Sequence, residues 1–161
     1  MTEILQPENA DQVLEAIKWA AAEKAQLELR SGGTKASLGR PMTDTRILDI
    51  SELSGISFYE PAELVLSAAA ATPMSEIQAA LDENNQQMAF EPPNLSHLLG
   101  SDGDAAKPDG TLAGILACNL AGPRRIKAGA ARDHFLGFQA VSGRGESFKC
   151  GSRVVKNVTG F

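Results

Sequence analysis

Residues 26–35 read Gln-Leu-Glu-Leu-Arg-Ser-Gly-Gly-Thr-Lys, and this stretch decides much of the fold. Polar and apolar residues alternate over residues 26–30, so we predict a short strand with Leu27 and Leu29 pointing inward. The pair Gly32-Gly33 then allows backbone geometry that side chains forbid. The sequence therefore predicts a strand that runs straight into a tight glycine loop.

A helix is predicted before this strand, and three more strands after it. Asn9 followed by Gln12 is typical of a helix start in which the two side chains cap the first turn. Trp19 lies off the apolar stripe, so it is either half-buried at a rim or faces something that this chain lacks. Strands are expected over residues 46–50, 55–59 and 63–71, and the last two are expected to form a hairpin-like pair around Pro61. These elements form a small N-terminal α+β lobe, residues 1–71. The apolar stripe of the helix comprises Val13, Leu14, Ile17, Ala20 and Ala21.

A second, larger lobe is predicted over residues 72–161. Thr72 is expected to cap a helix with Pro73 at its first position, and Met74, Ile77 and Leu81 form its apolar face. The prolines of residues 91–94 exclude regular structure there. A helix rich in small residues follows over 110–120, and strands 135–141 and 146–150 form a hairpin. The alternation of strands and helices predicts an α+β or α/β fold class.

Composition excludes several classes of function. The 161 residues carry a net charge of -5, which argues against a nucleic-acid-binding surface. The longest apolar run, residues 64–71, is too short to cross a bilayer. The N-terminus has no signal-peptide pattern. We expect a cytoplasmic protein.

The cysteines and histidines give little support for redox or metal chemistry. Cys118 and Cys150 do not form a CxxC pair, and we expect two small buried side chains rather than a redox pair or a thiol attached to a flavin. His97 and His134 lack neighbours at metal-ligand spacing, and His134 is expected to be structural. Residues 102–104, Asp-Gly-Asp, are expected to form a solvated turn rather than a calcium loop.

The loop after the first strand is the first candidate binding site. Its backbone N–H groups could converge on a diphosphate, with Thr34 and Ser37 as added donors and Arg30 and Lys35 neutralising charge. The alternative is a plain glycine turn. The Walker pattern is missing. Residues 143–145, Gly-Arg-Gly, would need a glycine at position 148 to form a dinucleotide-binding fingerprint, and that position is Phe148.

Residues 110–122 are the second candidate. Ala113, Gly114 and Ala117 leave one helix face nearly bare, so a flat ring system could approach it closely. Thr111 and Asn119 could hydrogen-bond the polar edge of such a ring. The alternative is a tightly packed helix–helix contact. Either interpretation requires something pressed against that face.

Together, the two glycine-rich segments carry a resemblance to a known family. Residues 30–34, residues 111–122 and the strand from Leu136 resemble the PCMH-type FAD-binding domain of vanillyl-alcohol-oxidase-type flavoproteins. Within that superfamily the chain is similar to the FAD-binding subunits of bacterial glycolate oxidases. The motifs that carry this second likeness are 122–125 (GPRR), 129–137 (GAARDHFLG) and 154–161 (VVKNVTGF).

The resemblance implies FAD held between two α+β lobes. The first loop would wrap the pyrophosphate, residues 110–119 with the proline pair would line the flavin, and the strand around Phe138 would lie nearer the adenine. Relatives with covalent flavin often have His where this chain has Thr34, so non-covalent FAD is implied. The residues that the resemblance places around FAD are Arg30, Ser31, Gly32, Gly33, Thr34, Lys35, Pro92, Pro93, Gly110, Thr111, Gly114, Ala117 and Asn119.

The implied function is the FAD-binding portion of a flavin-dependent 2-hydroxyacid (glycolate) oxidoreductase, in which substrate hydride passes to the flavin. The implied partners are a second flavoprotein subunit and an iron–sulfur subunit, which could bring the protein to a membrane. Relatives continue past Phe161, so we expect a C-terminally truncated domain without its substrate cap, inactive alone, and no catalytic base is assigned. The alternative is a non-catalytic assembly module with a degenerate flavin site.

Overall fold

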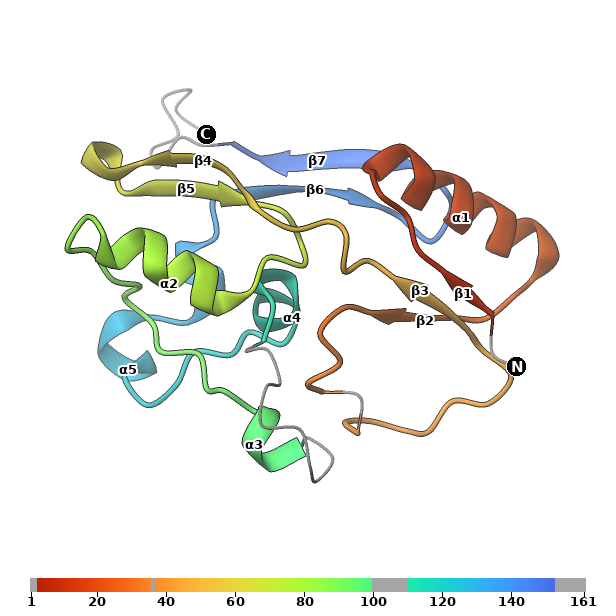
Figure 1. Ribbon diagram of the computed structural model, residues 1–161, viewed down its shortest axis with the longest axis horizontal. Helices are drawn as coiled ribbons and strands as arrows, with labels where there is room; N and C mark the ends of the chain where they lie inside the picture. Colours follow the sequence, from red (N-terminus) through yellow and green to blue (C-terminus); the bar gives the residue numbers. More distant parts are fainter. Residues whose placement is uncertain (1–2, 36, 100–109, 153–161) are drawn as a thin grey trace.

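The computed structural model describes residues 3–35, 37–99 and 110–152 (Figure 1). The predicted Asp-Gly-Asp turn at 102–104 and the apolar segment 154–161 lie outside the described residues. No helix within the described ranges is long and apolar enough to cross a membrane. The N-terminal elements are β1 (Ile4–Leu5), α1 (Ala10–Glu23), β2 (Leu27–Arg30) and β3 (Arg46–Asp49).

Three parallel strands in the order β1-β3-β2 form the first sheet. Leu48 of the central strand is 1% exposed. Leu29 was predicted to point inward, but it is 67% exposed and that prediction is wrong. β2 is an edge strand, so only one of its sides pairs with another strand. Leu27, at its start, is half-buried, whereas Leu29, near its carboxyl end, is exposed.

The cap of α1 follows the sequence closely. Asn9 accepts from the Gln12 amide at 3.0 Å, and the Gln12 side chain accepts from the Glu8 amide at 2.8 Å. The predicted stripe is half-buried or buried except for Ala21, which is exposed because it lies near the solvent side of the last turn. Trp19 is half-buried at a rim, with the Arg46 guanidinium 5.0 Å from its ring centre.

Two antiparallel hairpins and α1 lie along one side of the molecule, and the remaining helices lie on the other (Figure 1). Both hairpins were predicted from the sequence. The first comprises β4 (Ile56–Glu60), the 3-10 turn η1 (Pro61–Glu63) and β5 (Val65–Ala68), and the second comprises β6 (Gly137–Val141) and β7 (Ser147–Gly151).

The main hydrophobic core lies among the helices beneath these hairpins. In α2 (Met74–Asp82), Met74 and Ile77 are buried and Leu81 packs beside them, as predicted. The other helical elements are α3 (Ser96–Leu99), α4 (Leu112–Ala117), α5 (Arg125–Ala128) and the 3-10 turn η2 (Ala131–His134). The buried members of this core are Met74, Ile77, Phe90, Ile115, Ala121, Ala130 and Ala131.

The two cysteines are exposed, which contradicts the prediction that they are buried. Cys118 follows the last turn of α4. Cys150 belongs to β7, whose five residues are all exposed because no described element covers them. Burial preferences are averages over proteins, and here the local surroundings override them.

Thr72 was predicted to cap α2, and that prediction is wrong. The helix begins at Met74 with Pro73 in extended geometry before it, and no side chain caps its first turn. Thr72 is instead fully buried, where its hydroxyl accepts from the Gly55 amide at 3.0 Å and reaches the carbonyls of Ala69 and Gly55 at 2.8 and 3.1 Å. It fastens the end of the β4–β5 hairpin to its beginning.

We predict that Thr72→Val lowers the free energy of unfolding by about 1–3 kcal/mol, because the part-buried Gly55 amide loses its acceptor. Thr72→Ser is the matched control: it keeps the hydroxyl and should lose only about 0.8 kcal/mol with the methyl group. Urea unfolding measures both variants. A valine variant as stable as the serine variant would contradict this role.

Candidate functional site

The first loop opens directly from the carboxyl end of β2. Gly33 has a φ of +67° with no atom within 4 Å of the place where a Cβ would stand, so the loop needs glycine for its backbone and not for space. No acceptor among the described residues takes a hydrogen bond from the N–H groups of residues 32–35. Thr34 is 7% exposed, whereas Gly32 is exposed. The loop therefore presents free backbone donors around one buried hydroxyl-bearing side chain.

The second segment is held in place at the start of α4. The amides of Leu112 and Ala113 donate to the carbonyls of Thr72 and Ala70, both at 2.9 Å. The Met74 amide donates in turn to the carbonyl of Gly110, at 3.0 Å. These bonds fix the beginning of α4 beside the beginning of α2.

The two segments meet, although 80 positions separate them in sequence. The Ser31 and Thr111 hydroxyls are 3.1 Å apart and share a hydrogen bond. A Cβ placed on Gly114 would lie 3.2 Å from Lys35 Nζ, and one on Gly110 would lie 3.7 Å from the same atom. The sequence could propose each segment separately. The structure places them at one site.

The prolines of residues 91–94 also come close to the second segment. Pro92, Pro93 and Gly110 belong to the lining of a cleft of about 600 Å³ between α2 and α4. Other residues that line it are Met74, Phe90, Ile115 and Arg124. Three of the predicted flavin-side residues, Pro92, Pro93 and Gly110, thus share this cleft. The other four do not line it, namely Thr111, Gly114, Ala117 and Asn119.

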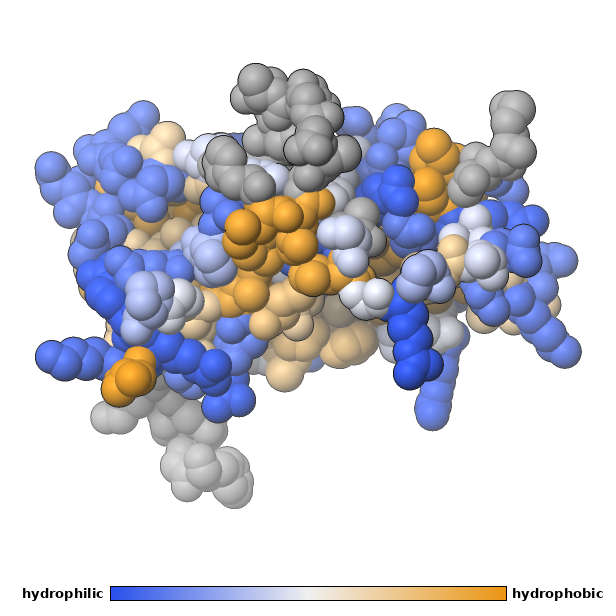
Figure 2. Space-filling model, turned by 90° about the horizontal axis from the view of Figure 1, so that it is seen from below, coloured by the Kyte–Doolittle hydropathy of each residue, from blue (hydrophilic) through white to orange (hydrophobic). Residues whose placement is uncertain are grey.

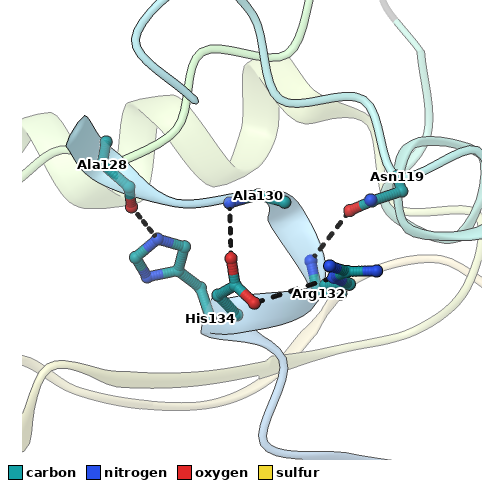
Figure 3. Close-up of polar contacts among 6 residues, drawn as sticks. Asn119, Ala128, Ala130, Arg132 and His134 are labelled. Atoms are coloured by element: carbon teal, nitrogen blue, oxygen red, sulfur yellow. Dashed lines mark hydrogen bonds and ion pairs between the residues drawn. The ribbon is translucent and has the colours of Figure 1, made fainter. Parts of the chain in front are cut away.

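Asn119 serves the neighbouring turn. Its Oδ1 accepts from the Arg132 amide at 3.1 Å (Figure 3). This oxygen therefore holds η2 in place, and the predicted contact of Asn119 with a ligand stays a prediction. Ala117, in the last turn of α4, is exposed.

The charged groups differ in what they contact. Arg30 donates to Glu28 through Nε at 3.1 Å and also through Nη2, so its charge is matched within its own strand. Lys35 is half-buried and is absent from every ion pair among the described residues. Lys35 is therefore the cation of the first loop whose charge is available to a ligand.

His134 has structural partners. Its Nε2 lies 2.6 Å from the Ala128 carbonyl, and its ring stacks on Phe90 with centroids 5.5 Å apart. The neighbouring Asp133 carboxylate accepts from the Ala130 amide at 2.8 Å (Figure 3). These contacts shape the turn between α5 and β6, as a structural histidine would.

One face of the molecule is partly apolar. Viewed from the side on which α3 and the loop after β2 lie, hydrophobic residues gather in the middle between hydrophilic flanks (Figure 2). The loop and α3 contribute exposed large hydrophobic residues, namely Leu38, Met42 and Leu98. Free amide donors, a cation and apolar surface suit a ligand that is anionic in one part and apolar in another.

Comparison with known proteins agrees with this geometry. The family model described as "FAD binding domain" matches residues 2–151. Glycolate oxidase subunit GlcE of Escherichia coli is 37% identical over 92% of this chain and 39% of its own length. D-lactate dehydrogenase of Archaeoglobus fulgidus is 23% identical over 98% of the chain and 33% of its own length. The chain thus spans about two fifths or less of these relatives.

Solved structures show the same fold. An alkyldihydroxyacetonephosphate synthase matches 97% of this chain and 27% of its own chain, with a TM-score of 0.67 and 16% identity. Phl p 4.0202, a glucose dehydrogenase, matches 91% of this chain and 28% of its own, with a TM-score of 0.68 and 15% identity. These likenesses confirm the predicted α+β, PCMH-type fold class.

Gly122 is a site residue whose role the sequence analysis missed. Its φ is +70°, and a Cβ there would lie 2.0 Å from the Glu91 carbonyl oxygen. Glu91 is held on this side by a 3.0 Å bond from its amide to the Ala121 carbonyl and by a 2.9 Å ion pair with Arg124. Gly122 thus lets the proline-containing segment lie against the end of the second segment. In the sequence, the feature that could have indicated this role is the proline that follows Gly122.

We expect Gly122→Ala to lower the free energy of unfolding by at least about 2 kcal/mol, because strain at positive φ adds to a backbone clash. Gly143→Ala is the matched control, since nothing lies within 4 Å of its Cβ position, and it should change stability by less than about 0.5 kcal/mol. Urea denaturation of both variants measures the difference. Equal stabilities would show that the close approach at Gly122 is unimportant.

Proposed function

The chain belongs to the FAD binding domain family, and on that premise we propose that it holds the FAD of a flavin-dependent 2-hydroxyacid oxidoreductase. Glycolate is the substrate that the similarity to GlcE supports. The name of the A. fulgidus relative also contains a 2-hydroxyacid, D-lactate, which supports the same substrate class. Bound FAD would accept the electrons of the oxidised substrate.

The convergence of the two glycine-rich segments carries this proposal. FAD contains a diphosphate. The amides of residues 32–35, which donate to no described acceptor, and the Lys35 ammonium fit a doubly anionic group. The cleft lined by Pro92, Pro93 and Gly110 offers an adjoining concave surface of mixed polarity, which suits the flavin side of the cofactor. The residues present therefore fit the cofactor.

Each group of residues has a proposed role in holding FAD. The amides of the first loop bind the diphosphate, and the Ser31–Thr111 hydrogen bond keeps this loop against α4. Thr34 replaces the histidine that attaches flavin in some relatives, so FAD is held non-covalently. We place the boundary of the two lobes at Thr72, with residues 1–71 and 72–161 on either side of the cofactor.

Hydroxyacid oxidation and assembly into a complex are part of this proposal, because the chain spans only 39% of the length of GlcE. The proposed partners are a second flavoprotein subunit and an iron–sulfur subunit. Similarity to a protein named as a subunit supports assembly into a complex. The proposed location is the cytoplasm, with membrane contact through these partners.

We predict that the purified protein is yellow or becomes so with FAD. Its absorption spectrum should show flavin bands after desalting, and acid precipitation should release the flavin into the supernatant because no covalent bond holds it. A colourless protein that leaves the fluorescence of added FAD unchanged would contradict the proposal. That result would favour an assembly module with a degenerate site.

Gly33→Val should weaken FAD binding by at least about fivefold, because a β-branched residue at positive φ strains the loop by about 1–3 kcal/mol and redirects its amides. The loss in binding should exceed the loss in folding stability. Gly143→Val, in the turn between β6 and β7, is the control and should leave the FAD dissociation constant unchanged. Unaltered affinity in the Gly33 variant would mean that the loop is only a turn.

A further inference from the structure

The side chain of Lys35 bridges the first loop and α4. It starts in the loop that follows β2 and ends beside Gly110 and Gly114, where its Nζ would lie 3.7 and 3.2 Å from a Cβ on each glycine. Its Cε would lie 3.6 Å from a Cβ on Gly114. The lysine therefore lies along the bare side of the glycine-containing segment.

This placement changes the meaning of the glycines in the second segment. The sequence predicted that a bare helix face at Gly114 would receive a flat ring system or another backbone. In the structure, the group beside Gly110 and Gly114 is the Lys35 ammonium, with the Thr111 hydroxyl 3.2 Å from the same Cβ position on Gly114. The missing side chain at Gly114 makes room for a cation, whereas a Cβ on Gly110 would make only an ordinary van der Waals contact with it.

Within residues 3–35, 37–99 and 110–152, no carboxylate forms an ion pair with the Lys35 ammonium. Four arginines do have a carboxylate within 4.0 Å, namely Arg30, Arg46, Arg124 and Arg132. The chain has 20 acidic and 15 basic residues, so an unmatched, half-buried cation is not a consequence of scarce carboxylates. An ammonium also has three hydrogen-bond donors, and no described acceptor takes one of them.

We propose that Lys35 is the charge partner of the FAD diphosphate and that it makes the site select phosphate-bearing ligands over uncharged flavin. The inference rests on the proposed function, because it concerns the same site. The loop amides supply partial charges, whereas Lys35 supplies a full charge from the α4 side. Gly114 is a positioning residue that leaves the ammonium room to face the ligand. Arg30 cannot substitute, since Glu28 already neutralises it.

The test compares three ligands on the flavin-stripped protein. Dissociation constants for FAD, ADP and riboflavin are measured by fluorescence or calorimetric titration at low and high NaCl concentration. Lys35→Met removes the charge while keeping the length, and Lys149→Met, on the exposed strand β7, is the matched control. Lys35→Gln repeats the test if the methionine variant folds poorly by circular dichroism, and Lys35→Arg tests rescue by a second cation.

The expected result is a loss of about tenfold or more in FAD and ADP affinity for Lys35→Met, with riboflavin binding within about twofold of the wild type. The salt dependence of FAD binding should also shrink, because one screened ionic contact is gone. Lys35→Arg should recover part of the loss, and Lys149→Met should behave as the wild type.

Two results would overturn the inference while leaving the proposed function intact. One is unchanged FAD affinity in a folded Lys35→Met protein. The other is an equal loss for FAD and riboflavin, which would indicate a general distortion of the site. If the wild-type protein binds none of the three ligands, the proposed function itself fails.

Discussion

Three backbone hydrogen bonds between residues 70–74 and residues 110–113 fix the geometry on which the site depends. They hold the beginnings of α2 and α4 side by side, and a bridge between Pro73 and Thr111 continues the contact. Thr72, which lies between these bonded residues, also forms hydrogen bonds with Gly55 through its buried hydroxyl. These hydrogen bonds thus connect the β4–β5 hairpin, the helical core and the segment that faces the first loop. Backbone bonds of this kind are strong because their groups would otherwise be buried without partners.

Electrostatics at the site follows from how the carboxylates are distributed. Glu28 neutralises Arg30, and Glu91 neutralises Arg124 at the edge of the cleft. Among the residues that the structure describes, no carboxylate pairs with Lys35 and no acceptor takes the N–H groups of residues 32–35. The region between the first loop and α4 therefore suits an anion, although the chain is acidic overall. The same region is where the two glycine-rich segments, 80 positions apart in sequence, lie side by side.

Local features were predictable from the sequence because they depend on neighbours along the chain. The Asn9–Gln12 cap, both hairpins and the glycine loop after β2 are of this kind. The overall fold was predicted from the family resemblance. Thr72, Leu29 and the cysteines were mispredicted because tertiary contacts decide their surroundings. The Gly122 approach to Glu91 and the position of Lys35 beside Gly114 also depend on long-range packing, which no local pattern contains.

Amide hydrogen exchange with and without FAD tests the central claim most directly, namely that the first loop and the start of α4 form one binding site. The account predicts that FAD slows exchange together in peptides covering residues 31–38 and 110–117, while the hairpin peptide 143–151 exchanges as before. Protection of only one of the first two peptides in protein that has bound FAD would contradict it.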